Sequence, residues 1–259
     1  MEAKEFPLLP EVSDEHTLTL QADLFKEMIR KTLFAVAVVD YRPVYTGAKF
    51  TVENGEISSV AIDNYRLARA KQPVASQDSF SFIVPGKTLA EILRLLPDSN
   101  SEIVTLFVAK RHLLIEYKDL LIISRLLEGE FINFNSVLPQ KSNTFVTIAT
   151  RAFIQSIERV SLIISDRLKS PVRCTFEDHL LKLSCTTTIG KSYDEVPCTL
   201  VGQPVEMGFN NKYLLDALRA AECDEVKLSM TNSSTALIVS PLKGDDFTFL
   251  VGPMRLKND

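Results

Sequence analysis

The sequence has few of the side chains that hold metal ions or perform nucleophilic chemistry. Its 259 residues include three histidines, none of them in an H-x-x-x-H or H-E-x-x-H spacing, and the G-x-S-x-G sequence of serine hydrolases is absent. The four cysteines all fall in the second half, and none forms a C-x-x-C pair, which argues against zinc. These residues are His16, His112, His179, Cys174, Cys185, Cys198 and Cys223. We expect no metal, no cofactor and the reduced cysteines of a cytosolic protein.

Long apolar runs and an excess of positive charge are also missing. No stretch approaches the ~20 apolar residues of a membrane span, and the start, Met1 to Pro7, lacks the apolar core of a signal peptide. The net charge is −4, from 29 basic and 33 acidic residues. Contact with nucleic acid would therefore need a local basic face.

Evidence for catalysis is equally thin. Gly86-Lys87-Thr88 resembles the end of a phosphate-binding P-loop, but that loop needs a glycine five residues earlier, where this chain has Ser81. Asp63 and Glu91 could be paired carboxylates, although nothing in their spacing demands it. An enzyme that works in a crevice between domains stays open as an alternative.

What the sequence does contain is a long internal repeat. Leu18 to Arg30 returns as Val146 to Glu158 at an offset of 128 residues, and Pro85 to Arg94 returns as Asn210 to Arg219 at an offset of 125. A period of this length fits a whole domain rather than a solenoid unit. We predict a linker over 1–14, one domain over 15–139 and a second over 144–259. Two copies of one domain suggest a surface built by repetition, such as an arc or a ring.

Within each domain the hydrophobic pattern predicts a strand, a helix and three strands, repeated once. The sequence Glu53-Asn54-Gly55 predicts a hairpin turn. Helices are expected over 21–34, 88–96, 151–165 and 211–221. Strands are expected near 18–20, 45–53, 56–62, 67–75, 80–84, 103–108, 112–117, 120–126, 144–149, 172–177, 180–185, 193–200, 204–209, 225–230, 235–239 and 247–252. The fold class is therefore α+β.

The four predicted helices carry cations at recurring places. Lys87 matches Lys212 and Arg94 matches Arg219 in the repeat, and Lys26, Arg30, Lys31, Arg151 and Arg159 add to the set. Such cations on parallel helices would contact phosphates without reading bases. A solvated helix face of mixed charge is the alternative.

Several segments carry a specific family resemblance. They are Asp63-Asn64-Tyr65-Arg66-Leu67-Ala68, Phe80 to Lys87, Ser124 to Phe131, Met207 to Leu218 and Pro253-Met254-Arg255-Leu256. Together they resemble the bacterial sliding clamp, the DNA polymerase III beta subunit, over nearly the whole chain. The family has three domains per chain, and this sequence resembles the second and third. We expect a fragment with an added Met1, or a natural short homologue.

The resemblance implies two tandem DNA-clamp domains with helices on the inner face and sheets outside. Two chains of the family close head to tail into a ring-shaped homodimer around duplex DNA. The ring is a non-catalytic processivity factor of DNA replication, expected in the cytoplasm with the nucleoid. Its expected partners are duplex DNA, held through the backbone, and the replicative polymerase, clamp loader and repair polymerases, which dock through short peptides containing glutamine and large apolar residues.

By position, the resemblance implies a peptide-binding cleft between the two domains. Its residues would be Tyr45, Ile62, Asn64, Tyr65, Arg66, Leu67, Ile132, Val137, Asn210, Tyr213, Ser234, Ala236, Leu250, Val251, Pro253, Met254, Arg255 and Leu256. Leu67, Val137, Val251 and Met254 would form the apolar wall, and Arg66 and Arg255 would form its edge. The DNA-facing residues would be Lys26, Arg30, Tyr41, Arg42, Lys87, Arg94, Arg151, Lys212 and Arg219.

Four positions depart from the family pattern. Asn64 replaces a usual glycine, Gly252 a frequent methionine, and Ile132 and Ser136 a frequent proline and arginine. A short paralogue that binds partner peptides without encircling DNA is the alternative within the binding class. Without a first domain the ring could not close in the family's manner, so we expect mainly monomer in dilute solution.

Overall fold

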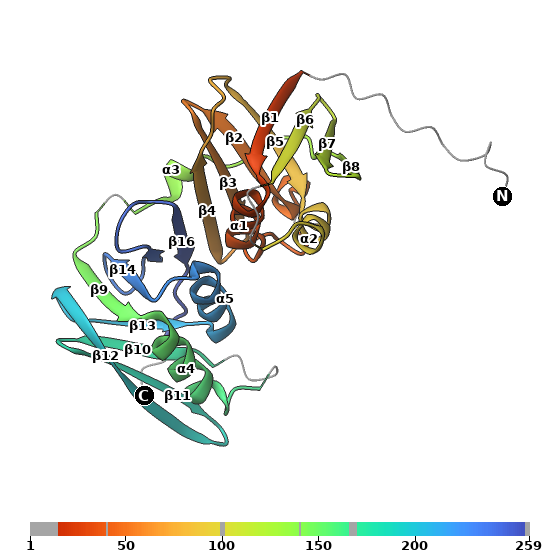
Figure 1. Ribbon diagram of the computed structural model, residues 1–259. Coiled ribbons are helices and arrows are strands. Elements are labelled where there is room, and N and C mark those ends of the chain that lie inside the picture. The colour runs from red at the N-terminus through yellow and green to blue at the C-terminus, as the bar shows by residue number, and fades with distance from the viewer. Residues whose placement is uncertain (1–14, 40, 99–101, 140, 166–169, 257–259) are drawn as a thin grey trace.

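A computed structural model describes residues 15–39, 41–98, 102–139, 141–165 and 170–256 (Figure 1). The first half contains β1 (His16–Gln21), α1 (Ala22–Leu33), the 3₁₀ helix η2 (Pro43–Thr46), β2 (Gly47–Glu53), β3 (Glu56–Ile62), β4 (Arg66–Pro73), β5 (Phe80–Pro85), α2 (Gly86–Leu95), β6 (Ile103–Val108), β7 (His112–Tyr117) and β8 (Leu120–Arg125). The predicted linker, 1–14, lies outside the described residues.

A short helix, α3 (Phe134–Val137), leads into the second half. This half contains β9 (Thr144–Ala149), α4 (Thr150–Ser161), β10 (Val172–Glu177), β11 (Leu180–Thr187), β12 (Gly190–Gly202), β13 (Val205–Phe209), α5 (Asn211–Ala221), β14 (Glu225–Met230), β15 (Leu237–Ser240) and β16 (Phe247–Val251). The strand-helix-three-strand unit thus occurs four times, as the sequence pattern predicts.

Local chemistry explains two of the boundaries. Asn54 and Gly55 both adopt positive φ, 54° and 75°, which a two-residue type I′ turn requires. Gly86 opens α2 because a Cβ there would come within 2.8 Å of Val36 Cγ1 and 3.1 Å of the Thr46 carbonyl oxygen. The glycine of the Gly-Lys-Thr segment is therefore a close-packing residue.

Three predicted elements were misjudged. The helix expected over 151–165 ends at Ser161, where the amide of Leu162 bonds back to the carbonyl of Arg159 and the Leu162 side chain is 84% exposed. The strand expected from 45 begins only at Gly47, because Pro43–Thr46 form a 3₁₀ turn. Helix α3 was not predicted.

The strands form two antiparallel sheets. Four strands pair in the order β1-β6-β7-β8, and twelve pair in the order β13-β10-β11-β12-β9-β14-β15-β16-β4-β3-β2-β5. The larger sheet crosses from one half to the other where β16 pairs with β4, from Phe247 opposite Ala70 to Val251 opposite Arg66. Main-chain hydrogen bonds therefore join the two halves.

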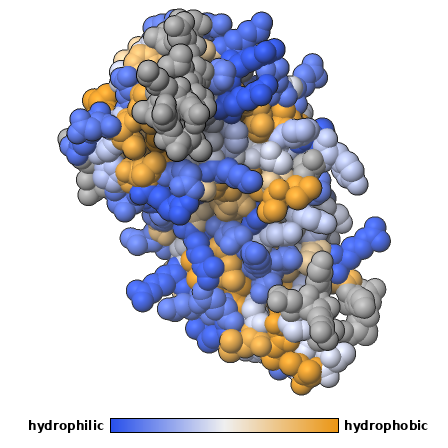
Figure 2. All heavy atoms as spheres, turned by 90° about the vertical axis from the view of Figure 1, so that its right-hand side faces the viewer, coloured by the Kyte–Doolittle hydropathy of each residue, from blue (hydrophilic) through white to orange (hydrophobic). Residues whose placement is uncertain are grey.

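The four long helices lie next to one another in the order α2, α1, α5, α4 (Figure 1). Each buries one apolar stripe, with Phe25 of α1 and Phe153 of α4 among the fully buried side chains, and one apolar cluster extends through both halves. Figure 2 shows hydrophilic side chains over most of the face seen from the right of Figure 1. No helix among the described residues is long and apolar enough to cross a membrane.

Candidate functional site at the junction of the two halves

The turn between β3 and β4 presents two of the predicted cleft residues. The Asp63 carboxylate accepts hydrogen bonds from the amides of Tyr65 (2.7 Å) and Arg66 (2.9 Å), so the turn is fixed by its own first side chain. Asn64 is exposed, and Tyr65 is 58% exposed. The turn therefore displays these two side chains at the edge of the first half.

This turn touches the second half directly. The amide of Gly252 donates to the Tyr65 carbonyl oxygen at 2.7 Å, and a Cβ on Gly252 would lie 2.9 Å from that oxygen. The Tyr65 ring stacks on Tyr213 of α5 with centroids 5.3 Å apart. Glycine at 252, a departure from the family pattern, thus permits the close approach of the turn.

Arg66 is turned into the junction. Its Nε donates to Asp63 Oδ2 at 3.0 Å and its Nη1 to Asp216 Oδ2 at 2.6 Å, and its side chain is only 11% exposed. The edge role expected for Arg66 does not describe this geometry, because the guanidinium is committed to two carboxylates.

An apolar cluster covers the outer face of the sheet beside the turn. Val60, Leu67, Phe134 and Leu250 form its buried centre. Its partly buried members are Ile62, Phe131, Val137, Leu138, Ala236 and Ile238. The structure thus brings together the predicted residues Ile62, Leu67, Val137, Ala236 and Leu250 from both halves.

Helix α3 closes this cluster, although the sequence reading missed it. The Asn133 side chain caps the helix by accepting a hydrogen bond from the Asn135 amide at 3.0 Å. An asparagine cap before Phe134 was the available signal, but four residues are too few for a helical period to show.

Two predicted cleft residues are buried elsewhere. Successive strand residues point to opposite faces, so Leu250 joins the outer cluster while Val251, fully buried, joins the main core. Tyr45 is 4% exposed and packs edge-on against Phe131, with ring centroids 5.2 Å apart. The expectation that Val251 forms part of the apolar wall of the cleft is therefore wrong. Tyr45 is buried and supports the site through its contact with Phe131, which belongs to the apolar cluster.

A second concavity, of about 560 Å³, lies at the C-terminal segment. Its lining residues are Glu206, Met207, Gly208, Ser233, Ser234, Pro253, Met254, Arg255 and Leu256. The Met254 amide donates to the Gly208 carbonyl oxygen at 2.7 Å, and a Cβ on Gly208 would meet Leu256 Cδ2 at 2.7 Å. The segment therefore forms an isolated antiparallel bridge with β13 through Met254, which is half-buried in the pocket wall.

Some of the polar groups near the C-terminal pocket already form hydrogen bonds within the protein. The side-chain oxygen of Asn210 caps α5 by accepting from the amides of Lys212 (3.0 Å) and Tyr213 (3.3 Å). Burial, and then the charge of Asp63, raise the pKa of the Tyr213 hydroxyl. Sequence reasoning missed Glu206, which Arg173 holds at 2.9 Å. No pattern marked this residue.

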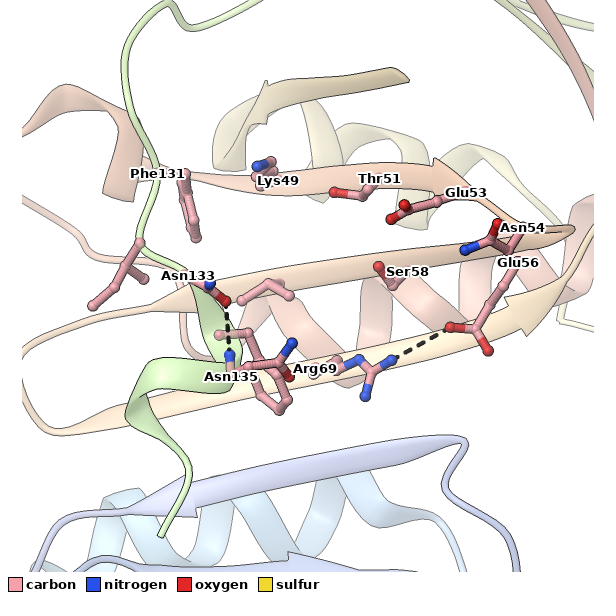
Figure 3. Close-up of a pocket in the computed structure, with 13 residues that line it drawn as sticks. Lys49, Thr51, Glu53, Asn54, Glu56, Ser58, Arg69, Phe131, Asn133 and Asn135 are labelled. Carbon is pink, nitrogen blue, oxygen red and sulfur yellow. Dashed lines mark hydrogen bonds and ion pairs between the residues drawn. The ribbon is translucent and has the colours of Figure 1, made fainter. Parts of the chain in front are cut away.

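Figure 3 shows a further groove of about 570 Å³ on the outer face of β2, β3 and β4. Arg69 pairs there with Glu56 at 3.3 Å and stacks over the Phe134 ring at 5.2 Å. Ile132, a predicted cleft residue, lines this groove, while α3 separates it from Leu67 and Leu250. Arg69 and Glu56 thus neutralise each other within the groove.

The predicted basic face is less exposed than expected. Lys26 is 8% exposed and donates to the Leu96 carbonyl oxygen at 2.6 Å, and Lys31 is 7% exposed and pairs with Glu27. The expectation that both lie on the exposed face of α1 is wrong. Lys26 is held at the C-terminal end of α2 by the Leu96 carbonyl and the Asp98 carboxylate, and the Lys31 ammonium lies 5.1 Å from the centre of the Phe247 ring of β16.

Other cations of the helices, of which Arg30 is half-buried and the rest are exposed, are paired with carboxylates. Arg30 bonds Asp98 and, across the junction, Glu222 at 2.8 Å. The remaining pairs are Arg94 with Glu91, Arg159 with Asp194 and Arg219 with Glu158.

Three exposed helix cations have no carboxylate within 4 Å in the described part of the chain. They are Lys87, Arg151 and Lys212, the second residues of α2, α4 and α5. A cation at the positive end of a helix is unfavourable, and here it recurs in three helices. Tyr41 and Arg42 are also exposed, in the loop after α1, and the Arg42 guanidinium lies 4.2 Å from the centre of the Tyr45 ring.

The described residues contain no group of His, Cys, Asp or Glu side chains that could hold a metal ion. Burial raises the pKa of the Cys174 thiol. The described residues at the junction do not include a pair of groups arranged as general acid and general base. The carboxylates of Asp63 and Asp216 there are hydrogen-bonded to Arg66.

The sequence matches two family models, the central domain of the DNA polymerase III beta subunit over residues 19–133 and its C-terminal domain over 135–255. The Beta sliding clamp of Bacillus subtilis is 31% identical over 98% of this chain and 68% of its own length. The crystal structure of the B. subtilis clamp has a TM-score of 0.95, with 30% identity, covering 99% of this chain and 69% of that one. A Pseudomonas aeruginosa clamp bound to griselimycin has a TM-score of 0.93 at 27% identity, covering 99% and 70%.

These matches define the class of protein as a non-catalytic processivity factor of DNA polymerase III. The chain belongs to the bacterial beta sliding clamp family, the DNA polymerase III beta subunits. The predicted α+β clamp fold and the predicted family are confirmed.

Proposed function

We propose that a ring-shaped homodimer in the bacterial cytoplasm keeps a DNA polymerase on duplex DNA by topological enclosure, and that the residues of this chain form the second and third clamp domains of each subunit. The two clamp domains of this chain are 15–139 and 144–259. The helices α2, α1, α5 and α4 face the DNA, and the outer surface at the junction docks polymerase, clamp loader and repair proteins through peptides.

One observation carries the docking proposal. The apolar cluster around Leu67 and Leu250 and the pocket beside Met254 are neighbours along the chain, because the segment from Leu250 to Met254 connects them, and Ser234 of the pocket is two residues from Ala236 of the cluster. A partner peptide can place its large apolar residues on the cluster and its glutamine towards the polar pocket. Tyr65 and Tyr213 stack on each other at the junction, and the Arg66 guanidinium lies over the Tyr213 ring.

The DNA proposal rests on the four adjacent helices and on the three unpaired cations Lys87, Arg151 and Lys212. Exposed, unpaired cations are available to phosphates, and they neutralise backbone charge without reading sequence. The paired cations contribute less, because a phosphate has to compete with their carboxylates. The pairing of these cations with carboxylates lowers the expected affinity for DNA. To that extent it favours the alternative, a short paralogue that binds partner peptides without encircling DNA.

The docking proposal is tested by calorimetry with a peptide containing glutamine, leucine and phenylalanine. We expect a dissociation constant in the micromolar range, roughly −7 to −8 kcal/mol. Met254→Ala should weaken binding by about 1–2 kcal/mol if Met254 anchors the pocket. Leu242→Ala is the control, because Leu242 is an apolar side chain of the same half, 45% exposed and outside the pocket. Absence of binding to the unaltered chain would refute the cleft.

A further inference from the structure

Arg66 connects the two halves through one guanidinium. Its Nε bonds Asp63 of the first half at 3.0 Å, and its Nη1 bonds Asp216 of α5 in the second half at 2.6 Å. Both bonds are charge-assisted, and the side chain is 11% exposed. The planar fork can serve two carboxylates at once, whereas an ammonium group is a point charge on a flexible stem.

The same guanidinium packs against aromatic rings of both halves. It lies 4.6 Å from the ring centre of Tyr213 and 5.6 Å from that of Phe34. Tyr213 in turn stacks on Tyr65. Two consecutive residues of the turn, Tyr65 and Arg66, therefore both contact Tyr213 of α5.

The backbone continues this connection towards the pocket. Arg66 stands opposite Val251 in the β4–β16 ladder, and the next amide, Gly252, bonds the Tyr65 carbonyl oxygen at 2.7 Å. Two residues later Met254 bonds Gly208 at 2.7 Å. A shift of the turn is thus transmitted along a short extended segment to the wall of the pocket.

We infer that Arg66 is a positioning residue of the docking site, which fixes the separation and relative orientation of its two subsites without itself contacting the peptide. The inference rests on the proposed peptide cleft. An extended peptide spans both subsites, so its affinity depends on their being held at one spacing before it binds. Loss of the two-carboxylate fork should leave both subsites intact but no longer in register.

The test compares Arg66→Lys and Asp216→Asn with Glu222→Gln in the 259-residue chain. Glu222 accepts from Arg30 Nη1 at 2.8 Å and so also supports an ion pair across the junction, but it lies outside the apolar cluster and the pocket. The first readout needs no ligand: hydrogen exchange at the amides of Gly252 and Met254. The second is the equilibrium and dissociation rate of a labelled peptide containing glutamine, leucine and phenylalanine, on variants shown to be folded by thermal melting.

Arg66→Lys and Asp216→Asn should both speed exchange at Gly252 and Met254, and both should weaken peptide binding roughly tenfold, mainly through faster dissociation. Glu222→Gln should change neither. The double variant, Arg66→Lys with Asp216→Asn, should bind the peptide no more weakly than whichever single variant has the lower affinity. Each change removes the same Arg66–Asp216 ion pair, so the two effects should not add.

Two results would overturn the inference. One is unchanged exchange and affinity in Arg66→Lys and Asp216→Asn. The other is an equal loss in Glu222→Gln, since that would show a general loosening of the junction. If the unaltered chain binds no peptide, the proposed cleft is refuted, and the inferred role of Arg66 in docking is refuted with it. The hydrogen-exchange measurement then still shows, independently of any peptide, whether Arg66 holds the Gly252–Met254 segment.

Discussion

Replacing the three unpaired helix cations should weaken DNA binding and yet stabilise the fold. The variant is Lys87→Gln, Arg151→Gln and Lys212→Gln combined. Each cation is the second residue of its helix, at the positive end of the helix dipole, and none has a carboxylate within 4 Å in the described ranges. Removing a positive charge at this end relieves about 0.3 kcal/mol per helix at an exposed site, or about 1 kcal/mol for three.

The loss of DNA affinity can be scaled from counterion release. Each phosphate contact contributes about −0.9 to the slope of log K against log salt. Three lost contacts reduce the slope by about 2.7, which amounts to a roughly 40-fold smaller change in affinity between 50 and 200 mM salt. The effect should be the same for unrelated DNA sequences, because phosphates carry no base information.

The matched control replaces Arg94, Arg159 and Arg219 by glutamine. These arginines are exposed cations of the same helices, and each pairs with a carboxylate. Arg94, Arg159 and Arg219 lie in last turns, where a cation is favourable, so their removal should lower stability slightly. Fluorescence anisotropy with duplex DNA over a salt series, together with thermal melting, measures both quantities. An unchanged salt slope in the first variant, or an equal fall in both, would refute the assignment of the DNA contacts.

Two further changes test the packing and the charge network. Gly86→Ala should destabilise the first half by about 1–3 kcal/mol in urea unfolding, because the new Cβ would lie 2.8 Å from Val36 Cγ1 and 3.1 Å from the Thr46 carbonyl oxygen. The hydrogen bond from Lys26 holds the pKa of Asp98 below its ordinary value. The stability contributed by the ionised Asp98 carboxylate is therefore fully present above the unfolded-state pKa of about 3.9 and is lost as the pH falls through the lower pKa of the folded state. Asp98→Asn should therefore flatten the acid limb of the stability curve below about pH 4, and an unchanged acid limb would contradict the linkage.

Much of the fold could be predicted from the sequence because its strands alternate and its helices carry a regular apolar stripe. The end of α4 was misjudged because Leu162-Ile163-Ile164 continues the apolar pattern after the backbone has left the helix. Lys26 was placed on the surface because helical periodicity says nothing about Leu96 and Asp98, which reach it from α2's C-terminal end.

The candidate site depended on contacts that no local pattern encodes. Leu250 and Val251 are neighbours in sequence, and only the observed pairing of β16 shows that one faces the outer cluster and the other the core. Arg66 is part of a recognisable segment, but its second carboxylate, Asp216, lies 150 residues further along the chain. Family resemblance indicated the region, and the geometry of the junction decides which side chains are accessible.

The strand pairing between β4 and β16 has a mechanical consequence. A hinge at this junction would have to break a ladder of five residue pairs, the Arg66 ion pairs and the Lys71–Asp245 contact together. Because all of these bonds would have to break at the same time, the junction resists bending of one half relative to the other. In the proposed ring, any motion that lets a DNA duplex in or out therefore has to occur away from this junction, with the two halves moving as one stiff segment.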